Sequence, residues 1–172
     1  MTWFWLFVLY SFAGYGLEKL FAAVTASPQQ VRKCFLLLPL CPVYGLGMLA
    51  VLALPEAWRL DGRVILWGGL AATAVEYAVH WGYDALLGVR FWDYSGVFGN
   101  LRGRVCLPFT LLWGVLTAAA VWWVQPAVER LAEQTVPEVT YLCLLAFTAD
   151  ALCSARILYV RKDPEALRAD GE

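Results

Sequence analysis

Three titratable residues at four-residue spacing lie within one long apolar stretch of the sequence. Glu76, His80 and Asp84 fall inside Val64–Leu87. Steps of four residues rotate a helix by only about 40°, so the three side chains share one helix face. A carboxylate at the centre of a bilayer costs roughly 2.5–3.5 kcal/mol on insertion scales. The spacing therefore predicts a polar site within a membrane, where a histidine between carboxylates could relay protons.

Two other chemistries use the same side chains. Cys41 or Cys106 could join His80 as a metal ligand, but a metal needs three or four ligands in a set geometry and the chain has a single histidine. Either thiol could act as a nucleophile if His80 served as its base. We favour a hydrogen-bonded packing role for His80, and we expect no metal site and no cofactor. The 5 cysteines contain no Cys-x-x-Cys pair, so no disulfide framework is expected.

The elements that must position these residues are membrane-spanning helices. The chain is 61% hydrophobic and 16% charged, whereas soluble domains average roughly 45–50% and 25%. The apolar residues gather into blocks of the length that crosses a bilayer, namely Trp3–Val24, Phe35–Leu54, Val64–Leu87, Leu107–Gln125 and Val139–Tyr159. We expect an all-α bundle of five transmembrane helices, formed by a single domain over residues 1–160, with a charged cytoplasmic tail over 161–172.

The basic residues indicate how this bundle is oriented. If five spans alternate, only Arg59, Arg63 and Arg130 of the 13 Lys and Arg residues fall on one side of the membrane. Basic residues concentrate on the cytoplasmic side, which places the N-terminus outside and the C-terminus in the cytoplasm. The first block lacks a basic start and is interrupted by Glu18 and Lys19, so we expect a span rather than a signal peptide.

The second apolar block cannot be a regular helix throughout. Pro39 and Pro42 remove backbone donors, and glycines follow at 45 and 47. The regular part would cover only about 18 Å. We therefore expect a helix broken near its cytoplasmic end, with Phe35–Cys41 unwound at membrane depth, where irregular backbone is buried or lines a cavity. A simple proline kink is the alternative.

The connection between the third and fourth spans is rich in aromatic and arginine residues. It interleaves four aromatic side chains with charge and glycine, namely Phe91, Trp92, Tyr94 and Phe98. Aromatic rings favour the membrane interface, so this cytoplasmic loop should lie in the interface or fold back under the bundle.

The arginines of this loop allow two interpretations. In a structural one, Arg104 pairs with Asp93, or an arginine pairs with Glu18 or Glu76, because buried charges need partners. In a functional one, Arg102 and Arg104 cradle an anionic headgroup or substrate.

Several polar groups should meet toward the cytoplasmic half of the bundle. Alternation of the spans brings Glu18 and Glu76 to similar depth, with the broken start of the second span and the Trp92–Cys106 loop nearby. Asp150 could join them from the fifth span.

At these motifs the chain resembles the small bacterial membrane proteins labelled "putative ABC transporter permease", or ABC-transporter type IV. The resemblance covers about residues 4–125. It rests on Phe12-Ala-Gly14-Tyr-Gly-Leu-Glu18, Phe35 to Gly47, Glu76-Tyr77, Arg90-Phe-Trp92-Asp93-Tyr94-Ser95, Asn100-Leu-Arg-Gly103-Arg104-Val-Cys106-Leu and Trp113-Gly114. This chain departs from the family pattern at Cys34, Leu38, Asp84 and Thr110, and His80 does not belong to it.

The resemblance selects the candidate site residues. The polar set matching the family motifs is Glu18, Cys41, Tyr44, Glu76, Asp93, Asn100, Arg104 and Cys106; His80, Asp84, Trp92 and Asp150 are secondary. It implies a transport component in the bacterial inner membrane, with a polar site opening to the cytoplasm and a separate ATPase subunit docking on the 88–107 loop. The chain itself has no phosphate-binding Gly-x-x-x-x-Gly-Lys-Ser/Thr loop.

Two alternatives to transport follow from the same residues. The first is a membrane-embedded enzyme acting on a lipid or isoprenoid headgroup, with Glu76 or Asp93 as general base and Arg104 binding the anion. The second is a non-catalytic assembly partner whose charges hold a bundle together. Besides the lipid bilayer and the ATPase, the partner expected is an anionic small molecule or headgroup, and not a nucleic acid.

Overall fold

The structure is a computed structural model that describes residues 1–25 and 34–167. Helices make up nearly all of its regular structure: α1 (Thr2–Thr25), α2 (Pro42–Leu52), α3 (Glu56–Arg59), α4 (Arg63–Gly82), the π-helical turn η1 (Tyr83–Leu87), α5 (Leu107–Ala119), the π-helical turn η2 (Ala120–Val124), α6 (Gln125–Glu133), α7 (Pro137–Arg161) and the 3-10 turn η3 (Pro164–Leu167). The described residues form no β-strand beyond an isolated bridge between Leu101 and Val105. The predicted all-α class is confirmed.

Within residues 1–25 and 34–167, three helical segments are long and apolar enough to cross a membrane. They are α1, the continuous 27-residue stretch Leu107–Glu133 formed by α5, η2 and α6, and the 25-residue α7. The apolar α2 is shorter, and α4, which carries Glu76 and His80, is not among the three. The five spans expected from the sequence are thus not confirmed as a set, and the count of five stays a prediction. Of the predicted tail, residues 168–172 lie outside the described part.

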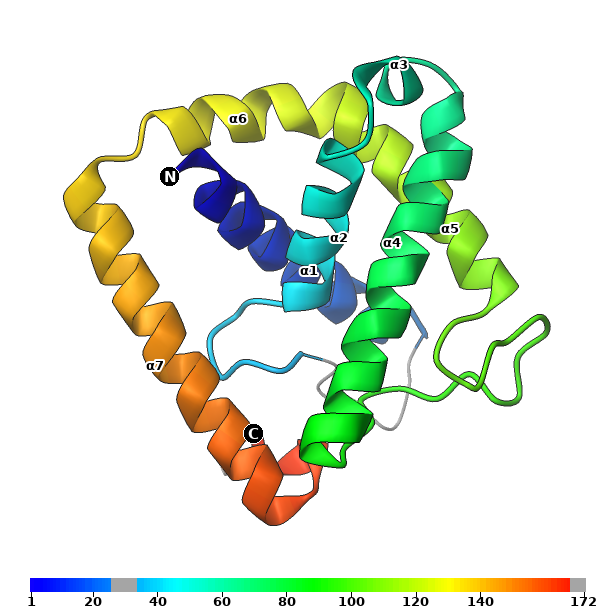
Figure 1. The fold of residues 1–172 in the computed structure, drawn as a ribbon, viewed down its shortest axis with the longest axis vertical. Coiled ribbons are helices and arrows are strands. Elements are labelled where there is room, and N and C mark those ends of the chain that lie inside the picture. Colours follow the sequence, from blue (N-terminus) through cyan, green and yellow to red (C-terminus); the bar gives the residue numbers. More distant parts are fainter. Residues whose placement is uncertain (26–33, 168–172) are drawn as a thin grey trace.

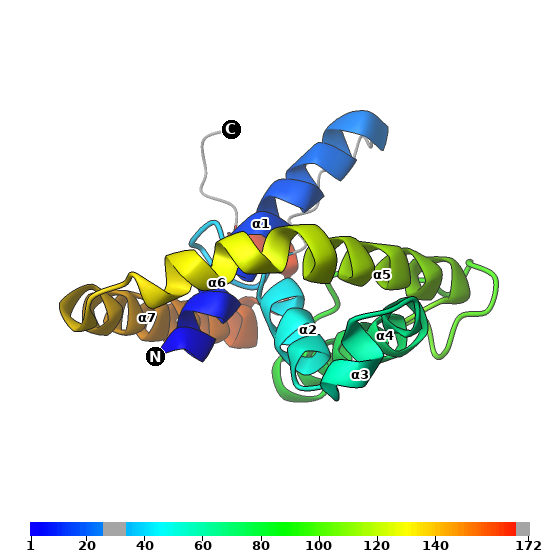
Figure 2. The same ribbon diagram turned by 90° about the horizontal axis from the view of Figure 1, so that it is seen from above.

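The helices form an open frame around α1 and α2 (Figure 1). In that view α6 runs along the top, α7 along the left and α4 along the right, and α1 and α2 lie between them. From above, α5, α6 and α7 share one layer, α2, α3 and α4 lie on one side of it, and the C-terminal end of α1 projects from the other (Figure 2). The closest packing joins α4 to α5 and α2, and α1 to α2 and α6.

Glycines let these helices approach closely. A Cβ added to Gly14 would lie 2.5 Å from the Cβ of Tyr44, and one added to Gly69 would lie 3.0 Å from the backbone of Gly114. In lipid, no hydrophobic effect drives two helices together, so their association depends on van der Waals packing. Small residues at the contact allow this packing to be extensive. Gly14 thus places Tyr44 of α2 directly against α1, and Gly69 and Gly114 bring α4 and α5 together.

The break before α2 is present where the prolines predicted it. Residues 34–41 are non-helical and α2 begins at Pro42. Asp150 of α7 accepts hydrogen bonds from the backbone N–H groups of Leu37 (3.1 Å) and Leu38 (3.0 Å), and the carbonyl of Ser11 accepts one from Cys41 N–H (2.8 Å). Backbone N–H groups away from water need acceptors within the protein. The two hydrogen bonds to Asp150 therefore attach this segment to α7.

Candidate functional site

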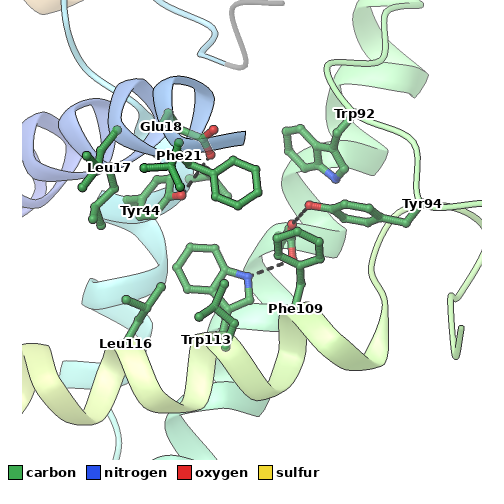
Figure 3. A pocket seen from close by; sticks show the side chains of 14 residues that line it. Leu17, Glu18, Phe21, Tyr44, Trp92, Tyr94, Phe109, Trp113 and Leu116 are labelled. Atoms are coloured by element: carbon green, nitrogen blue, oxygen red, sulfur yellow. Dashed lines mark hydrogen bonds between the residues drawn. The ribbon is translucent and has the colours of Figure 1, made fainter. Parts of the chain in front are cut away.

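A cavity of about 310 Å³ lies where α1, α2, α4, α5 and the loop after η1 meet (Figure 3). Its lining combines two carboxylates with aromatic and aliphatic side chains: Leu17, Glu18, Leu20, Phe21, Val24, Val43, Tyr44, Glu76, Trp92, Tyr94, Phe109, Leu112, Trp113 and Leu116. Ligand sites in proteins are mostly apolar cavities of roughly 300–1,000 Å³ with a few placed polar groups. By size and lining, this cavity is the candidate site.

Glu76 lies at the wall of the cavity between two neutral donors. Its side chain is buried on α4, at 5% exposure. The Tyr94 hydroxyl donates to Oε1 (3.1 Å) and the Trp113 indole N–H donates to Oε2 (2.9 Å). Burial raises the pKa of Tyr94, and the neighbouring Glu76 raises it further, so this phenol stays a neutral donor. The loop and α5 thereby stabilise the buried carboxylate of Glu76.

Glu18 and Tyr44 form the opposite part of the lining. The Tyr44 hydroxyl donates to Oε1 of Glu18 over 2.9 Å, as the dashed line in Figure 3 shows. The ring centroids of Tyr44 and Trp113 lie 5.0 Å apart. Tyr44, which donates to Glu18, therefore contacts Trp113, which donates to Glu76. Glu18 is half-buried.

Asp84 pairs with two arginines outside the cavity. It lies in η1, where Oδ1 accepts from Arg90 Nε (3.1 Å) and Oδ2 accepts from Arg104 Nη2 (3.1 Å). Arg104 also donates to the Tyr77 hydroxyl (3.2 Å) and lies over the Tyr77 ring. The predicted pairing of Arg104 with Asp93 is therefore wrong, and the predicted pairing of an arginine with Glu18 or Glu76 stays a prediction.

The end of α4 explains why Arg104 pairs with Asp84. The π-helical turn that follows Gly82 carries Asp84 to the side where both arginines of the loop can reach it. Arg104 is consequently held by a carboxylate and a phenol and is absent from the cavity lining, while Arg102 is an exposed residue with φ of 56°. The geometry does not support the anion cradle expected from these two arginines.

Asp93 and Asn100 hold the loop in shape. Oδ1 of Asp93 accepts from the backbone N–H (2.8 Å) and hydroxyl of Ser95, and these bonds, the hydroxyl first, lower the pKa of Asp93. Asn100 donates to the carbonyls of Ser95 and Val97 and accepts from Gly103 N–H. Gly103 has φ of 69°, which suits glycine. Its carbonyl accepts from Tyr94 N–H (2.7 Å), so the loop sets the position of Tyr94.

His80 and Trp92 fasten the loop to α4. His80 Nε2 lies 3.0 Å from the Trp92 carbonyl, and the Trp92 indole donates to the Arg104 carbonyl (2.9 Å). His80 is 2% exposed and packs edge-on against the Trp92 ring. This is the packing role favoured from the sequence. Glu76, His80 and Asp84 therefore have three separate sets of partners.

The thiols proposed as ligands or nucleophiles are enclosed at helix starts. Cys41 and Cys106 are each 1% exposed and are the N-cap residues of α2 and α5. Neither lines the cavity. Among residues 1–25 and 34–167 no group of three or more His, Cys, Asp or Glu side chains could hold a metal ion.

The structure thus divides the predicted site residues into two groups. Glu18, Tyr44, Glu76 and Trp92 line the cavity. The other candidates lie outside its lining, in the loop, at helix starts or on α7: Cys41, His80, Asp84, Asp93, Asn100, Arg104, Cys106 and Asp150.

Four lining aromatics were not among the predicted site residues. They are Phe21, Tyr94, Phe109 and Trp113, of which Tyr94 was predicted only as an aromatic residue of the interfacial loop. A signal existed for Trp113, because an indole N–H within a membrane helix needs an acceptor. The two phenylalanines carry no polar atom, so spacing alone could not assign them to a cavity.

Comparison with known proteins places the chain in one family. No curated protein and no solved structure gives a significant match. The family model described as "Putative ABC-transporter type IV" matches residues 5–155, which include every residue that lines the cavity. This match extends the motif resemblance beyond residue 125 and into α7. The chain therefore belongs to the ABC-transporter type IV family.

Proposed function

We propose that this protein is the membrane component of a transport system and that the cavity between Glu18 and Glu76 is its substrate site. The observation that carries the proposal is the cavity itself. Two carboxylates from two different helices face one apolar space of about 310 Å³, in a chain that has spanning helices and belongs to an ABC-transporter-type family. Intramembrane carboxylates that face a cavity are typical of substrate and ion pathways.

The arrangement of the helices fits a site that can change its access. The lining comes from four helices and a loop rather than from one rigid hairpin. The segment before α2 is non-helical and is clamped by Asp150, and broken helices at membrane depth often border transport sites. Under this proposal five spans cross the inner membrane, with the N-terminus outside, the C-terminus in the cytoplasm and the cavity opening toward the cytoplasm.

A separate ATPase would dock on the cytoplasmic loop between η1 and α5. The tip of this loop presents exposed apolar and basic side chains together, with Phe98 at 79% and Leu101 at 57% exposure and Arg102 beside them. The internal bonds of Asn100 give the tip a defined shape, which a docking surface needs.

The enzyme alternative receives less support. It required Arg104 to bind an anion and Asp93 or Glu76 to act as a base. Arg104 is engaged by Asp84 and Tyr77, Asp93 is engaged by Ser95, and neither lines the cavity. Only Glu76 keeps a place at the site.

The test compares solute accumulation by membrane vesicles from the source cells. Inverted vesicles carrying the wild type, Glu18→Gln, Glu76→Gln or the control Glu138→Gln are given a water-soluble cell extract, with and without ATP, and retained solutes are identified by mass spectrometry. Glu138 is exposed in the first turn of α7, away from the cavity. We expect at least one solute to accumulate with ATP in wild-type and control vesicles and to be lost in both cavity variants. Identical profiles in all four, with equal protein levels, would support the assembly-partner alternative instead.

A further inference from the structure

The helices α1 and α5 present apolar faces to the cavity with the same sequence spacing. The face on α1 consists of Leu17, Leu20, Phe21 and Val24, and the face on α5 consists of Phe109, Leu112, Trp113 and Leu116. Positions i, i+3, i+4 and i+7 lie on one side of a helix, and the repeat covers roughly 10 Å of its length. In Figure 3, α1 passes above the cavity and α5 passes below it. The two apolar faces therefore border the same space from opposite sides.

The polar tips of the lining aromatics are engaged by the protein itself. Among the described residues of the lining, four aromatic side chains carry an O–H or N–H group. Each of these groups donates a hydrogen bond within the protein: Tyr44 to Glu18, Tyr94 and Trp113 to Glu76, and Trp92 to the carbonyl of Arg104. What these rings offer to a ligand is therefore their carbon faces, in addition to the leucine and valine side chains of the lining.

The apolar face of α1 is open on its outer side. Leu20 and Val24 are 61% and 76% exposed, although both line the cavity. They lie on the C-terminal end of α1, which projects from the layer of α5, α6 and α7 (Figure 2). A ligand can therefore reach the space between α1 and α5 from the side of this projecting end.

The volume of the cavity suits a single apolar chain. At about 310 Å³, the cavity lies at the lower end of the range for ligand sites, which is roughly 300–1,000 Å³. We propose that the cavity binds a water-soluble amphiphile with one unbranched apolar chain, which lies between the apolar faces of α1 and α5. The polar part of the amphiphile stays at the open side, while Glu18 and Glu76 orient the aromatic rings that contact the chain.

This inference rests on the proposed function, because it assigns a substrate class to the same cavity. A bilayer lipid also carries apolar chains, so the test must separate a soluble amphiphile from a lipid. The probe is an octanol that carries a diazirine in its chain, and the sample is the full-length protein in phosphatidylcholine nanodiscs. After photolysis, mass spectrometry identifies the labelled residues.

We expect the labelling of residues 17–24 and 109–116 to saturate and to be displaced by excess unlabelled octanol. Leu142 and Leu145 on α7 are 68% and 69% exposed and provide the internal reference. Their labelling should rise in proportion to the probe concentration, because the surrounding lipid offers no limited number of sites.

Matched tryptophan variants test where the chain lies. Leu112→Trp and Leu116→Trp fill the space between the two faces, so displaceable labelling should fall by roughly fivefold or more, since a filled cavity has no room for the chain. Leu111→Trp adds the same bulk at a neighbouring position of α5 that is 63% exposed and does not belong to the lining. Its labelling should stay within about twofold of the wild type. Thermal melts establish that each variant is folded.

Three results would overturn the inference. The first is labelling of the two faces that excess octanol does not displace, and the second is unchanged displaceable labelling in both folded variants of Leu112 and Leu116. The third is labelling of the faces by a phosphatidylcholine with a diazirine in one acyl chain that excess octanol leaves unchanged, which would assign the space to a bilayer lipid. The first and third results require only the wild type, so an unstable variant does not weaken the test.

The outcome is separable from that of the proposed function. Loss of displaceable labelling with ATP-dependent solute accumulation intact would reject this inference alone. Displaceable labelling without such accumulation would reject the proposed function and leave the amphiphile site standing.

Discussion

The indole N–H of Trp113 donates a hydrogen bond to Oε2 of Glu76 over 2.9 Å and joins α5 to α4 at the cavity wall. The bond supplies a buried carboxylate with a donor that carries no charge. It also fixes the plane of an aromatic ring that faces the cavity. One contact therefore serves both helix packing and the shape of the candidate site.

Trp113→Phe should destabilise the protein through this bond. The change keeps an aromatic ring but removes the donor, and we expect a loss of roughly 1 kcal/mol in the free energy of unfolding. Unfolding by SDS in mixed micelles measures it. The control is Trp123→Phe, which removes an indole that is 76% exposed and should cost much less. Equal losses for both variants would mean that the hydrogen bond to Glu76 adds no stability.

Gly14→Ala should disturb the contact between α1 and α2. The new methyl group would lie 2.5 Å from the Cβ of Tyr44, and overpacking of this kind typically costs about 1–3 kcal/mol. Because Tyr44 must move, its bond to Glu18 should also weaken. A thermal melt in detergent checks the stability.

Gly16→Ala is the matched control for that variant. It lies on the same helix, where an added Cβ meets nothing within 4 Å, and alanine favours helix over glycine by up to about 1 kcal/mol. We expect it to melt at or slightly above the wild-type temperature. If both alanine variants melt alike, the close approach of α1 and α2 is not needed.

Asp150→Ala should release the segment that precedes α2. Two backbone N–H groups, of Leu37 and Leu38, would lose their carboxylate acceptor. We expect amide hydrogen exchange over residues 34–41 to rise by roughly tenfold or more, measured by mass spectrometry in nanodiscs. Glu138→Ala, an exposed acidic residue on the same helix, should leave that exchange unchanged. Unaltered exchange in Asp150→Ala would show that the two hydrogen bonds to Asp150 do not hold the segment in place.

A double-mutant cycle should separate the Asp84–Arg104 pair from an ordinary surface pair. The side chains of Asp84 and Arg104 are 24% and 14% exposed, whereas those of Asp61 and Arg63 are each 53% exposed. Exposed ion pairs contribute little because water screens them. We therefore expect a larger coupling free energy between Asp84→Asn and Arg104→Gln than between Asp61→Asn and Arg63→Gln. A coupling for the inner pair no larger than that of the outer pair would contradict the role given to Asp84.

The sequence by itself determined the all-α class of the protein and identified Glu76 as the residue whose burial costs the most free energy. Apolar blocks of spanning length predicted helices, two prolines predicted the break before α2, and the burial of Glu76 in an apolar stretch predicted a polar site. These signals are local. Bilayer thickness, proline geometry and the free-energy cost of a buried charge each constrain a residue together with its neighbours in the sequence.

Only the tertiary structure decided which polar groups meet. The sequence grouped Glu76, His80 and Asp84 by helical spacing, but a π-helical turn and the folded-back loop give each its own partners. Which arginine pairs with which carboxylate depends on how segments that are distant in the sequence pack together. The periodicity of the sequence carries no information about this packing. Asp84 binds Arg104 outside the cavity lining, whereas Glu18 and Glu76 lie in the lining beside aromatic rings.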